Sequence, residues 1–327
     1  MSAPPSRWPR VGLGCASLGS PELSDANAER VINAAIARGI RFFDVAPLYG
    51  GGLAEERLGR AIAALPRDSY VLCTKVGVTR PYGQPPMPQG ATRRRQFDVW
   101  DYSAAATRAS ITKSLERLRI DRLDVVHLHD CENHLDQCLD AYAELARLRG
   151  AGVVGAIGIG SNLVEPVRHL IDRARFDAFL LAGRYTLLDA SGGALIEAAH
   201  ARGIAVVAGG VFNSGVLAAW PQPAPTYGYQ PADRFVVERT AHIAAICAHH
   251  RVPLATAALR FVLANAAITT VLIGPRTVDE LEEIMNATEA RIPQSLWSDL
   301  VDARVIPAVN PGRAEWGNAA DSLPRDH

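Results

Sequence analysis

Eight short apolar runs recur along the chain, separated by longer segments in which apolar residues return every three or four positions. The runs are nearly continuous in Val, Ile and Leu, as is typical of parallel strands buried on both faces. A buried strand followed by a helix, repeated eight times, predicts an α/β fold of the (β/α)8 TIM-barrel type. The predicted strands are 11–16 (VGLGCA), 42–46 (FFDVA), 70–76 (YVLCTKV), 123–129 (LDVVHLH), 153–160 (VVGAIGIG), 177–182 (DAFLLA), 204–209 (IAVVAG) and 269–274 (TTVLIG).

Local signals place helices between these runs. Ser103 and Thr277 are typical N-cap residues, and Gly39 and Gly150 are typical stops. The helices they bound are predicted at 26–39, 103–119, 135–150 and 278–287. A doubly wound sheet is the alternative fold, but the first strand reads GLGCASLG and lacks the G-x-G-x-x-G spacing of that fold.

The length of 327 residues suits one barrel domain, with a core at about 10–305 and a C-terminal tail at 306–327. Two connections, 77–101 and 213–233, are too long for tight turns. They follow the third and seventh strands and therefore lie on the C-terminal face, where we expect them to wall or cover a site. Solvated surface is the alternative, and the run Arg93–Arg95 is better explained as a solvated loop face than as an anion clamp.

Composition narrows the range of partners and locations. Lys plus Arg equal Asp plus Glu at 34 each, so bulk charge predicts neither a nucleic-acid nor a membrane partner. Five scattered cysteines without a CxxC pair indicate reduced thiols. The start, MSAPPSRWPRVG, lacks the apolar segment of a secretion signal, and no run of 18 apolar residues occurs. We expect a cytoplasmic protein, and the sequence does not predict its oligomeric state.

Polar side chains at three successive strand ends predict a catalytic site. Asp44, Lys75 and His129 end the second, third and fourth strands, and Tyr49 follows the second. Strand ends of a barrel converge on one mouth, so these groups can meet there. An ammonium beside a phenol lowers the phenol pKa, and an aspartate keeps the lysine charged. The four groups together predict proton transfer to a carbonyl or from an alcohol.

The segments that carry these residues resemble the aldo-keto reductase family, over about residues 10 to 290. They are FFDVAPLYGGGLAEERLG, VLCTKVG, LDVVHLHD and AIGIGSN. The resemblance implies a catalytic tetrad of Asp44, Tyr49, Lys75 and His129, and a nicotinamide cofactor across the barrel mouth. It is strongest to the branch that contains D-threo-aldose 1-dehydrogenase (L-fucose dehydrogenase), L-galactose dehydrogenase and pyridoxal 4-dehydrogenase. That branch implies oxidation of a sugar hemiacetal to a lactone. A pyridoxal dehydrogenase or a general aldehyde and ketone reductase of the same family is the alternative.

The resemblance also implies cofactor contacts. Ser161 and Asn162 match the family's pair on the nicotinamide carboxamide. Two departures stand out: Ala182 replaces a usual glutamine, and Gly209 or Gly210 replaces a stacking tyrosine, for which Phe212 is a possible substitute. The remaining positions line the pyrophosphate or the adenosine end: Phe212, Asn213, Ser214, Gly215, Gly274, Arg276 and Glu280.

The coenzyme and the substrate are less closely defined. The carboxylate of Glu280 disfavours a 2′-phosphate, so NAD is preferred to NADP as the cofactor, with NADP left open. Sugar contacts are expected from Trp100, Asp130 and Arg184. His127 faces the same way as His129, one layer deeper, and is predicted to be structural. The HLH pair could alternatively bind a metal, but the later strand ends offer no further ligands, so no metal is predicted. A cofactor-sensing subunit without activity is the other alternative.

Overall fold

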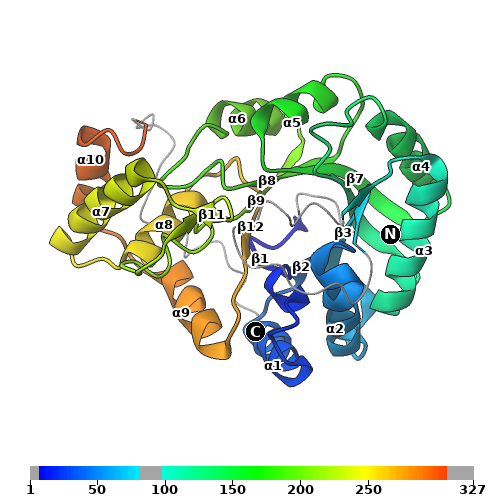
Figure 1. Ribbon diagram of the computed structural model, residues 1–327, viewed down its shortest axis with the longest axis horizontal. Coiled ribbons are helices and arrows are strands. Elements are labelled where there is room, and N and C mark those ends of the chain that lie inside the picture. Colours follow the sequence, from blue (N-terminus) through cyan, green and yellow to red (C-terminus); the bar gives the residue numbers. More distant parts are fainter. Residues whose placement is uncertain (1–6, 81–97, 308–327) are drawn as a thin grey trace.

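The computed structural model describes residues 7–80 and 98–307. Within them, eight parallel strands close into a barrel in the order β1-β12-β9-β8-β7-β6-β3-β2, with helices around the outside (Figure 1). All eight predicted strands are confirmed, most of them one or two residues shorter than expected. They are β1 Val11–Gly14, β2 Phe42–Asp44, β3 Val71–Val76, β6 Leu123–His129, β7 Val154–Ser161, β8 Ala178–Ala182, β9 Ala205–Gly209 and β12 Thr270–Ile273.

The strand residues divide between two apolar clusters. One fills the inside of the barrel and includes Phe42, Val71, Val125 and Val207, with Trp8 packed on Phe42. The other lies between the outer faces of the strands and the helices, and holds most of the core. Burial on both faces explains why the strands read as continuous apolar runs.

The four helices predicted by range are confirmed. Ser103 and Thr277 cap theirs by accepting the backbone N–H of Ala106 and Glu280, as their residue types predict. Further helices complete the ring. The set is α1 Asp25–Ala37, α2 Leu53–Ile62, α3 Ala104–Leu118, α4 Cys138–Gly150, α5 Val164–Ile171, α6 Gly193–Ala201, α8 Leu254–Leu263 and α9 Val278–Glu289. Two more, α7 Arg234–His249 and α10 Gln294–Asp302, pack against each other beside the barrel.

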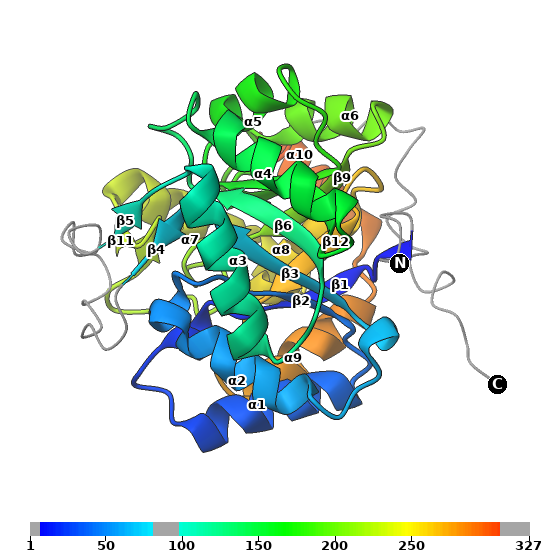
Figure 2. The same ribbon diagram turned by 90° about the vertical axis from the view of Figure 1, so that its right-hand side faces the viewer.

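Both long connections carry small antiparallel ribbons on the C-terminal face. β4 Val78–Thr79 pairs with β5 Val99–Trp100, and β10 Thr226–Tyr227 pairs with β11 Gln230–Pro231. β4, β5 and β11 are all at the same end of the barrel in Figure 2. The middle of the first connection, 81–97, with its arginine run Arg93–Arg95, and the tail 308–327 lie outside the described residues.

Across residues 7–80 and 98–307, every helix falls short of the length and apolar character needed to cross a membrane.

Candidate active site

The four side chains predicted to form the site meet at the C-terminal rim of the barrel. Lys75 donates to Oδ1 of Asp44 at 2.6 Å and to the carbonyl of Val45 at 2.9 Å. Its Nζ lies 4.9 Å from the centre of the Tyr49 ring. Tyr49 in turn meets His129 edge to face, with ring centres 5.9 Å apart. The arrangement forms one chain of contacts from the carboxylate to the imidazole.

The run of three glycines after Tyr49 explains how the phenol is held. Gly50, Gly51 and Gly52 have φ values of 67°, 67° and 106°, a region that side chains rarely adopt, so the chain can turn sharply into α2. Gly19 approaches from the loop after β1, where a Cβ would lie 2.5 Å from the backbone carbon of Tyr49. The glycines therefore fix the Tyr49 backbone between two loops.

His129 is fixed through its own backbone. The buried Tyr102, just before α3, donates its hydroxyl to the carbonyl of His129 at 2.5 Å. This contact could not be predicted from the sequence, because Tyr102 comes from a long connection and acts on a main-chain atom. It ties the connection after β3 to the end of β6.

The charges of these side chains depend on how deeply they are buried. Lys75 and Asp44 are 1% and 2% exposed. Burial lowers the pKa of Lys75, but Asp44 and Tyr49 raise it by more, so the ammonium stays charged. Burial raises the pKa of Asp44, against the lowering effect of Lys75. The pKa of His129 falls well below its usual value through burial and the nearby Lys75, so its imidazole is neutral.

The expectation that Lys75 makes Tyr49 more acidic than free tyrosine is wrong for the protein alone. Burial raises the pKa of the Tyr49 phenol, and the lowering by Lys75 does not offset it. The expectation counted the ammonium but not the desolvation of the phenolate. Tyr49 is therefore a neutral proton donor at neutral pH.

The predicted carboxamide residues are tied to the neighbouring loop. Ser161 donates to Glu132 at 3.1 Å, and Asn162 donates to Asp130 at 3.3 Å. Sequence reasoning missed Glu132, which lies three residues after His129 and carried no motif signal. The two contacts join the end of β7 to the loop after β6.

Arg184, expected to contact either cofactor or substrate, has protein partners. Its guanidinium pairs with Asp189 at 2.8 Å and donates to the backbone oxygen of Asn162 at 2.6 Å. Arg184 thus supports the backbone beside the predicted carboxamide pair. A direct contact between Arg184 and a sugar would have to use a guanidinium N–H group that these two bonds do not occupy.

The loop after β9 has the conformation of a polar cradle. Asn213, Ser214 and Gly215 have φ values of 45°, 59° and 93°. The Asn213 amide donates to the carbonyl of Gly183 at 3.2 Å, while its buried Oδ1 accepts no bond within the described residues.

Ser214 is bound to the β10–β11 ribbon, since its hydroxyl accepts the N–H of Tyr229 at 3.0 Å and its carbonyl accepts the Thr226 hydroxyl at 3.1 Å. Phe212 packs on the core.

The segment after β12 is exposed and polar. Gly274 and Arg276 lie between β12 and α9, and both are open to solvent. The carboxylate of Glu280 accepts the backbone N–H of Arg276 at 2.7 Å, and so has a structural role as well as its predicted one. Trp100, expected near substrate, stacks on His134 with ring centres 6.4 Å apart, next to the site.

Beneath the tetrad lies a group of possible metal-ligating type. Asp44, Cys73 and His127 each offer one ligand atom, and these three atoms lie within 4.8 Å of one another. All three side chains are buried. The positive charge of Lys75, 2.6 Å from the same carboxylate, opposes a cation there. His129 is not part of this group. The group therefore does not correspond to the metal pair of His127 and His129 that the HLH segment offered as an alternative.

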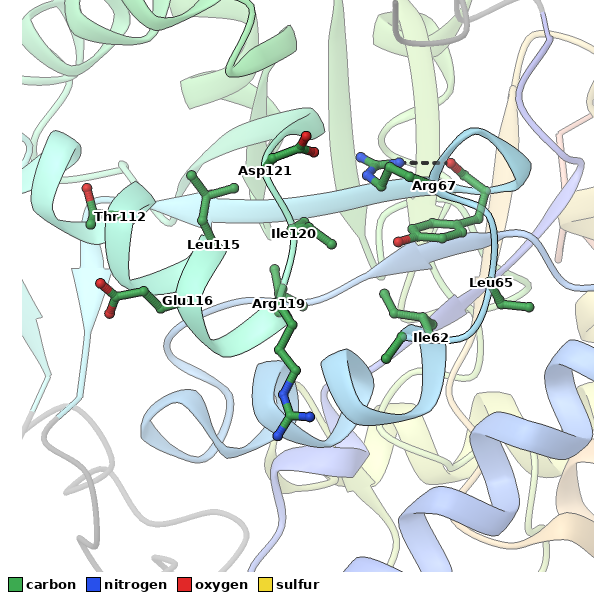
Figure 3. Close-up of a pocket in the computed structure, with 12 residues that line it drawn as sticks. Ile62, Leu65, Arg67, Thr112, Leu115, Glu116, Arg119, Ile120 and Asp121 are labelled. Carbon is green, nitrogen blue, oxygen red and sulfur yellow. Dashed lines mark hydrogen bonds between the residues drawn. The ribbon is translucent and has the colours of Figure 1, made fainter.

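A groove of about 630 Å³ lies elsewhere, between α2 and α3. Arg67 and Tyr70 border it before β3, and Ile120 and Asp121 border it before β6, as Figure 3 shows for the labelled Arg67, Ile120 and Asp121. These positions belong to the N-terminal ends of the strands, opposite the tetrad. Chemistry in barrels of this type occurs at the other face.

The structure is a closed eight-stranded barrel with Asp44, Tyr49, Lys75 and His129 on one rim. The sequence profile of the Aldo/keto reductase family matches residues 10–304, and the chain belongs to that family. Members use nicotinamide cofactors, so this protein is a nicotinamide-dependent oxidoreductase.

Several relatives of known activity are similar along most of their length. The chain is 39% identical to D-threo-aldose 1-dehydrogenase of a Pseudomonas species, covering 91% of this chain and 95% of the relative. It is 34% identical to pyridoxal 4-dehydrogenase of Microbacterium luteolum, covering 89% and 92%. It is 30% identical to L-galactose dehydrogenase of Arabidopsis thaliana, covering 84% and 82%.

Solved structures share the fold. An aldo-keto reductase from Bacillus halodurans in its holo form superposes with a TM-score of 0.73 at 23% identity, covering 92% of this chain and 93% of that one. A glycerol dehydrogenase from Gluconobacter oxydans gives 0.72 at 22% identity, covering 93% and 94%.

Proposed function

We propose that this protein oxidises the cyclic hemiacetal of an aldose of the L-fucose or D-arabinose type to its lactone, with NAD as the preferred hydride acceptor. The observation that carries the proposal is the contact chain from Asp44 through Lys75 and Tyr49 to His129 at the barrel mouth. The similarity to a D-threo-aldose 1-dehydrogenase over nearly both lengths supports the substrate class.

The rim has groups that fit a nicotinamide dinucleotide. The buried Oδ1 of Asn213 lacks a partner within the described residues and can accept a bond from a polar ligand. Ser161 and Asn162 would hold the carboxamide, residues 212–215 the pyrophosphate, and Gly274, Arg276 and Glu280 the adenosine end. Bound there, the oxidised nicotinamide supplies a hydride acceptor.

The chain's own residues handle the proton. Tyr49 accepts the proton of the anomeric hydroxyl, and the Lys75 ammonium stabilises the phenolate that Tyr49 must present. Asp44 keeps Lys75 charged and oriented. The neutral His129 can donate a hydrogen bond to the reacting oxygen and so orient it.

The five cysteines, free and buried, support the expected cytoplasmic location.

A spectrophotometric screen tests the proposal. NAD and NADP are offered with L-fucose, D-arabinose, L-galactose, L-xylose or pyridoxal, and the absorbance of the reduced nicotinamide is followed. We expect turnover of an aldose with NAD. Turnover of pyridoxal alone would replace the substrate class with that of the 34% identical relative. Absence of turnover with every pair would favour a cofactor-sensing subunit.

The rate of oxidation should rise with pH. The reaction needs Tyr49 without its proton, and the raised pKa of Tyr49 keeps that form scarce at neutral pH. We expect kcat/KM for aldose oxidation to increase steadily from pH 6 to pH 10, while carbonyl reduction, which uses the protonated phenol, stays level between pH 7 and 9. An oxidation optimum near pH 7 would contradict Tyr49 as the base.

Coenzyme choice should respond to Glu280. Glu280→Arg replaces a repelling charge with a phosphate partner, so we expect the ratio of kcat/KM for NADP over NAD to rise about tenfold or more. Glu289→Arg makes the same charge change at the other end of α9 and serves as the control. Because Glu280 also accepts the N–H of Arg276, Glu280→Gln separates loss of charge from loss of that bond. An unchanged ratio would place the adenosine end elsewhere.

A further inference from the structure

Two buried side chains, Asp44 of the tetrad and His127 beneath it, have polar atoms without a partner among the described residues. Oδ2 of Asp44 accepts no hydrogen bond, although Oδ1 is bound to Lys75. Both ring nitrogens of His127 are also without a partner, and this side chain is 0% exposed. A buried carboxylate oxygen and a buried imidazole each cost stability if left unpaired. Such groups in one place call for a common explanation.

The two groups lie close enough to satisfy each other. The ligand atoms of Asp44, Cys73 and His127 are within 4.8 Å of one another. Two hydrogen bonds of about 2.8 Å through one buried water can span a distance of that size, and a direct bond can form where the oxygen and the ring nitrogen are closer than this limit. Strand pairing supports the geometry, since His127 on β6 stands opposite Lys75 on β3, and Asp44 stands opposite Cys73.

The neighbouring strand makes room for the imidazole. β7 has Gly158 opposite His127, and a Cβ at that position would lie 2.3 Å from Nδ1 of His127. An aliphatic side chain at 127 would be the ordinary way to fill the inside of a barrel. The buried histidine and the facing glycine form a matched pair that plain packing does not require.

We propose that His127 is a positioning residue of the active site: its ring N–H holds the second carboxylate oxygen of Asp44, directly or through one water, and so fixes Asp44 against Lys75. The inference rests on the proposed role of the tetrad. His127 does not touch substrate or cofactor in this account. It acts through Asp44, and through Asp44 on the ammonium that serves Tyr49.

The surroundings of His127 keep its ring neutral, so the ring is a hydrogen-bond donor rather than a cation. Burial, Lys75 and His129 hold its pKa well below the usual value, so the ring is neutral and has one N–H and one acceptor nitrogen. The donor suits Asp44, which is an acceptor when ionised. The titratable or charged groups that interact with Asp44 or His127 are Lys75, Tyr49, Cys15, Cys73 and His129. Of these, Cys73 can also donate to Asp44, through its weak S–H.

The test measures the acid limb of the pH–rate profile. Reduction of 4-nitrobenzaldehyde with the reduced coenzyme is followed from pH 4 to 8, a range in which Tyr49 keeps its proton. A hydrogen bond to a carboxylate favours its charged form, so removing it raises the pKa of Asp44. We expect His127→Leu to move the acid limb upward by about one pH unit or more and to lower kcat several-fold, with KM for the coenzyme unchanged. His127→Gln, which keeps an N–H donor, should recover part of both effects.

Two further variants keep the result interpretable. Gly158→Ala retains the imidazole but displaces its ring, and should reproduce the shift of the acid limb. Cys73→Ala removes only the S–H and should leave the limb in place. Circular dichroism and thermal unfolding confirm that each variant is folded.

The outcomes separate this inference from the proposed function. An acid limb that is unmoved in His127→Leu and in Gly158→Ala overturns the inference, as does a limb that moves in Cys73→Ala alone. Stoichiometric zinc in the purified wild-type protein would also overturn it, because the trio would then be a metal site. Full activity in Tyr49→Phe would instead refute the tetrad itself, whatever the His127 variants show.

Discussion

Replacing Tyr49 with phenylalanine is expected to lower kcat for aldose oxidation by about a thousandfold or more, because the substitution removes the group that accepts the hydroxyl proton. Coenzyme affinity should hardly change. The Tyr49 backbone is fixed by Gly19 and by the glycines that follow it, and a phenylalanine ring keeps the contacts with Lys75 and His129. Stopped-flow turnover and fluorescence titration with NAD measure the two quantities.

Tyr142→Phe is the matched control. Tyr142 lies on α4 and donates to the carbonyl of Arg175, away from the rim. The same loss of a hydroxyl there should leave turnover unchanged. A Tyr49→Phe protein that turns over normally, or one that loses NAD binding instead of catalysis, would contradict the role given to the phenol.

The second large effect is expected from Lys75→Met, which should damage stability and activity together. The substitution leaves the Asp44 carboxylate buried without its counter-ion, and breaking a buried pair in this way costs about 3–5 kcal/mol of unfolding free energy. Turnover should fall to background, because the phenolate of Tyr49 also loses its stabilising charge. Urea unfolding and the aldose assay report the two losses separately.

A double variant separates the two roles. Asp44→Asn with Lys75→Met removes both charges, so most of the stability should return while activity stays absent. The chain has only two lysines, and Lys113 on α3 is exposed, so Lys113→Met is the control for loss of a lysine. A Lys75→Met protein as stable as wild type would contradict the buried ion pair.

The scarcity of lysine in the chain indicates that the site requires an ammonium group rather than a guanidinium group. Nearly all of the 34 basic residues are arginines, and one of the two lysines lies in the tetrad. An ammonium is compact and can bind one carboxylate oxygen and a carbonyl in a confined space, as Lys75 does with Asp44 and Val45. A planar guanidinium with five donors has no comparable fit there.

The strands and the four rim residues could be predicted because both follow from local rules. Burial on two faces produces continuous apolar runs, and the closure of eight such strands brings their ends together. Asp44, Lys75 and His129 were identifiable as polar residues at the ends of otherwise apolar runs. Tyr49 was identifiable from its place before three glycines.

Other features could not be predicted, because they depend on distant partners. The pKa of Tyr49 is governed by burial, which sequence does not quantify, so its direction was predicted wrongly. Arg184 looked available for ligand, but its partners Asp189 and Asn162 come together only in the folded barrel. Tyr102 and Glu132 support the site from loops whose course no motif indicates. Helices α7 and α10 were also missed as additions to the eightfold repeat.

The facing pair Gly158 and His127 links the choice of residue at two positions on neighbouring strands. A Cβ at 158 would lie 2.3 Å from Nδ1 of His127 and 2.9 Å from the carbonyl oxygen of Ala178, so a larger residue there requires the imidazole to move. Anyone who redesigns this barrel interior therefore has to choose the residues at 127 and 158 together.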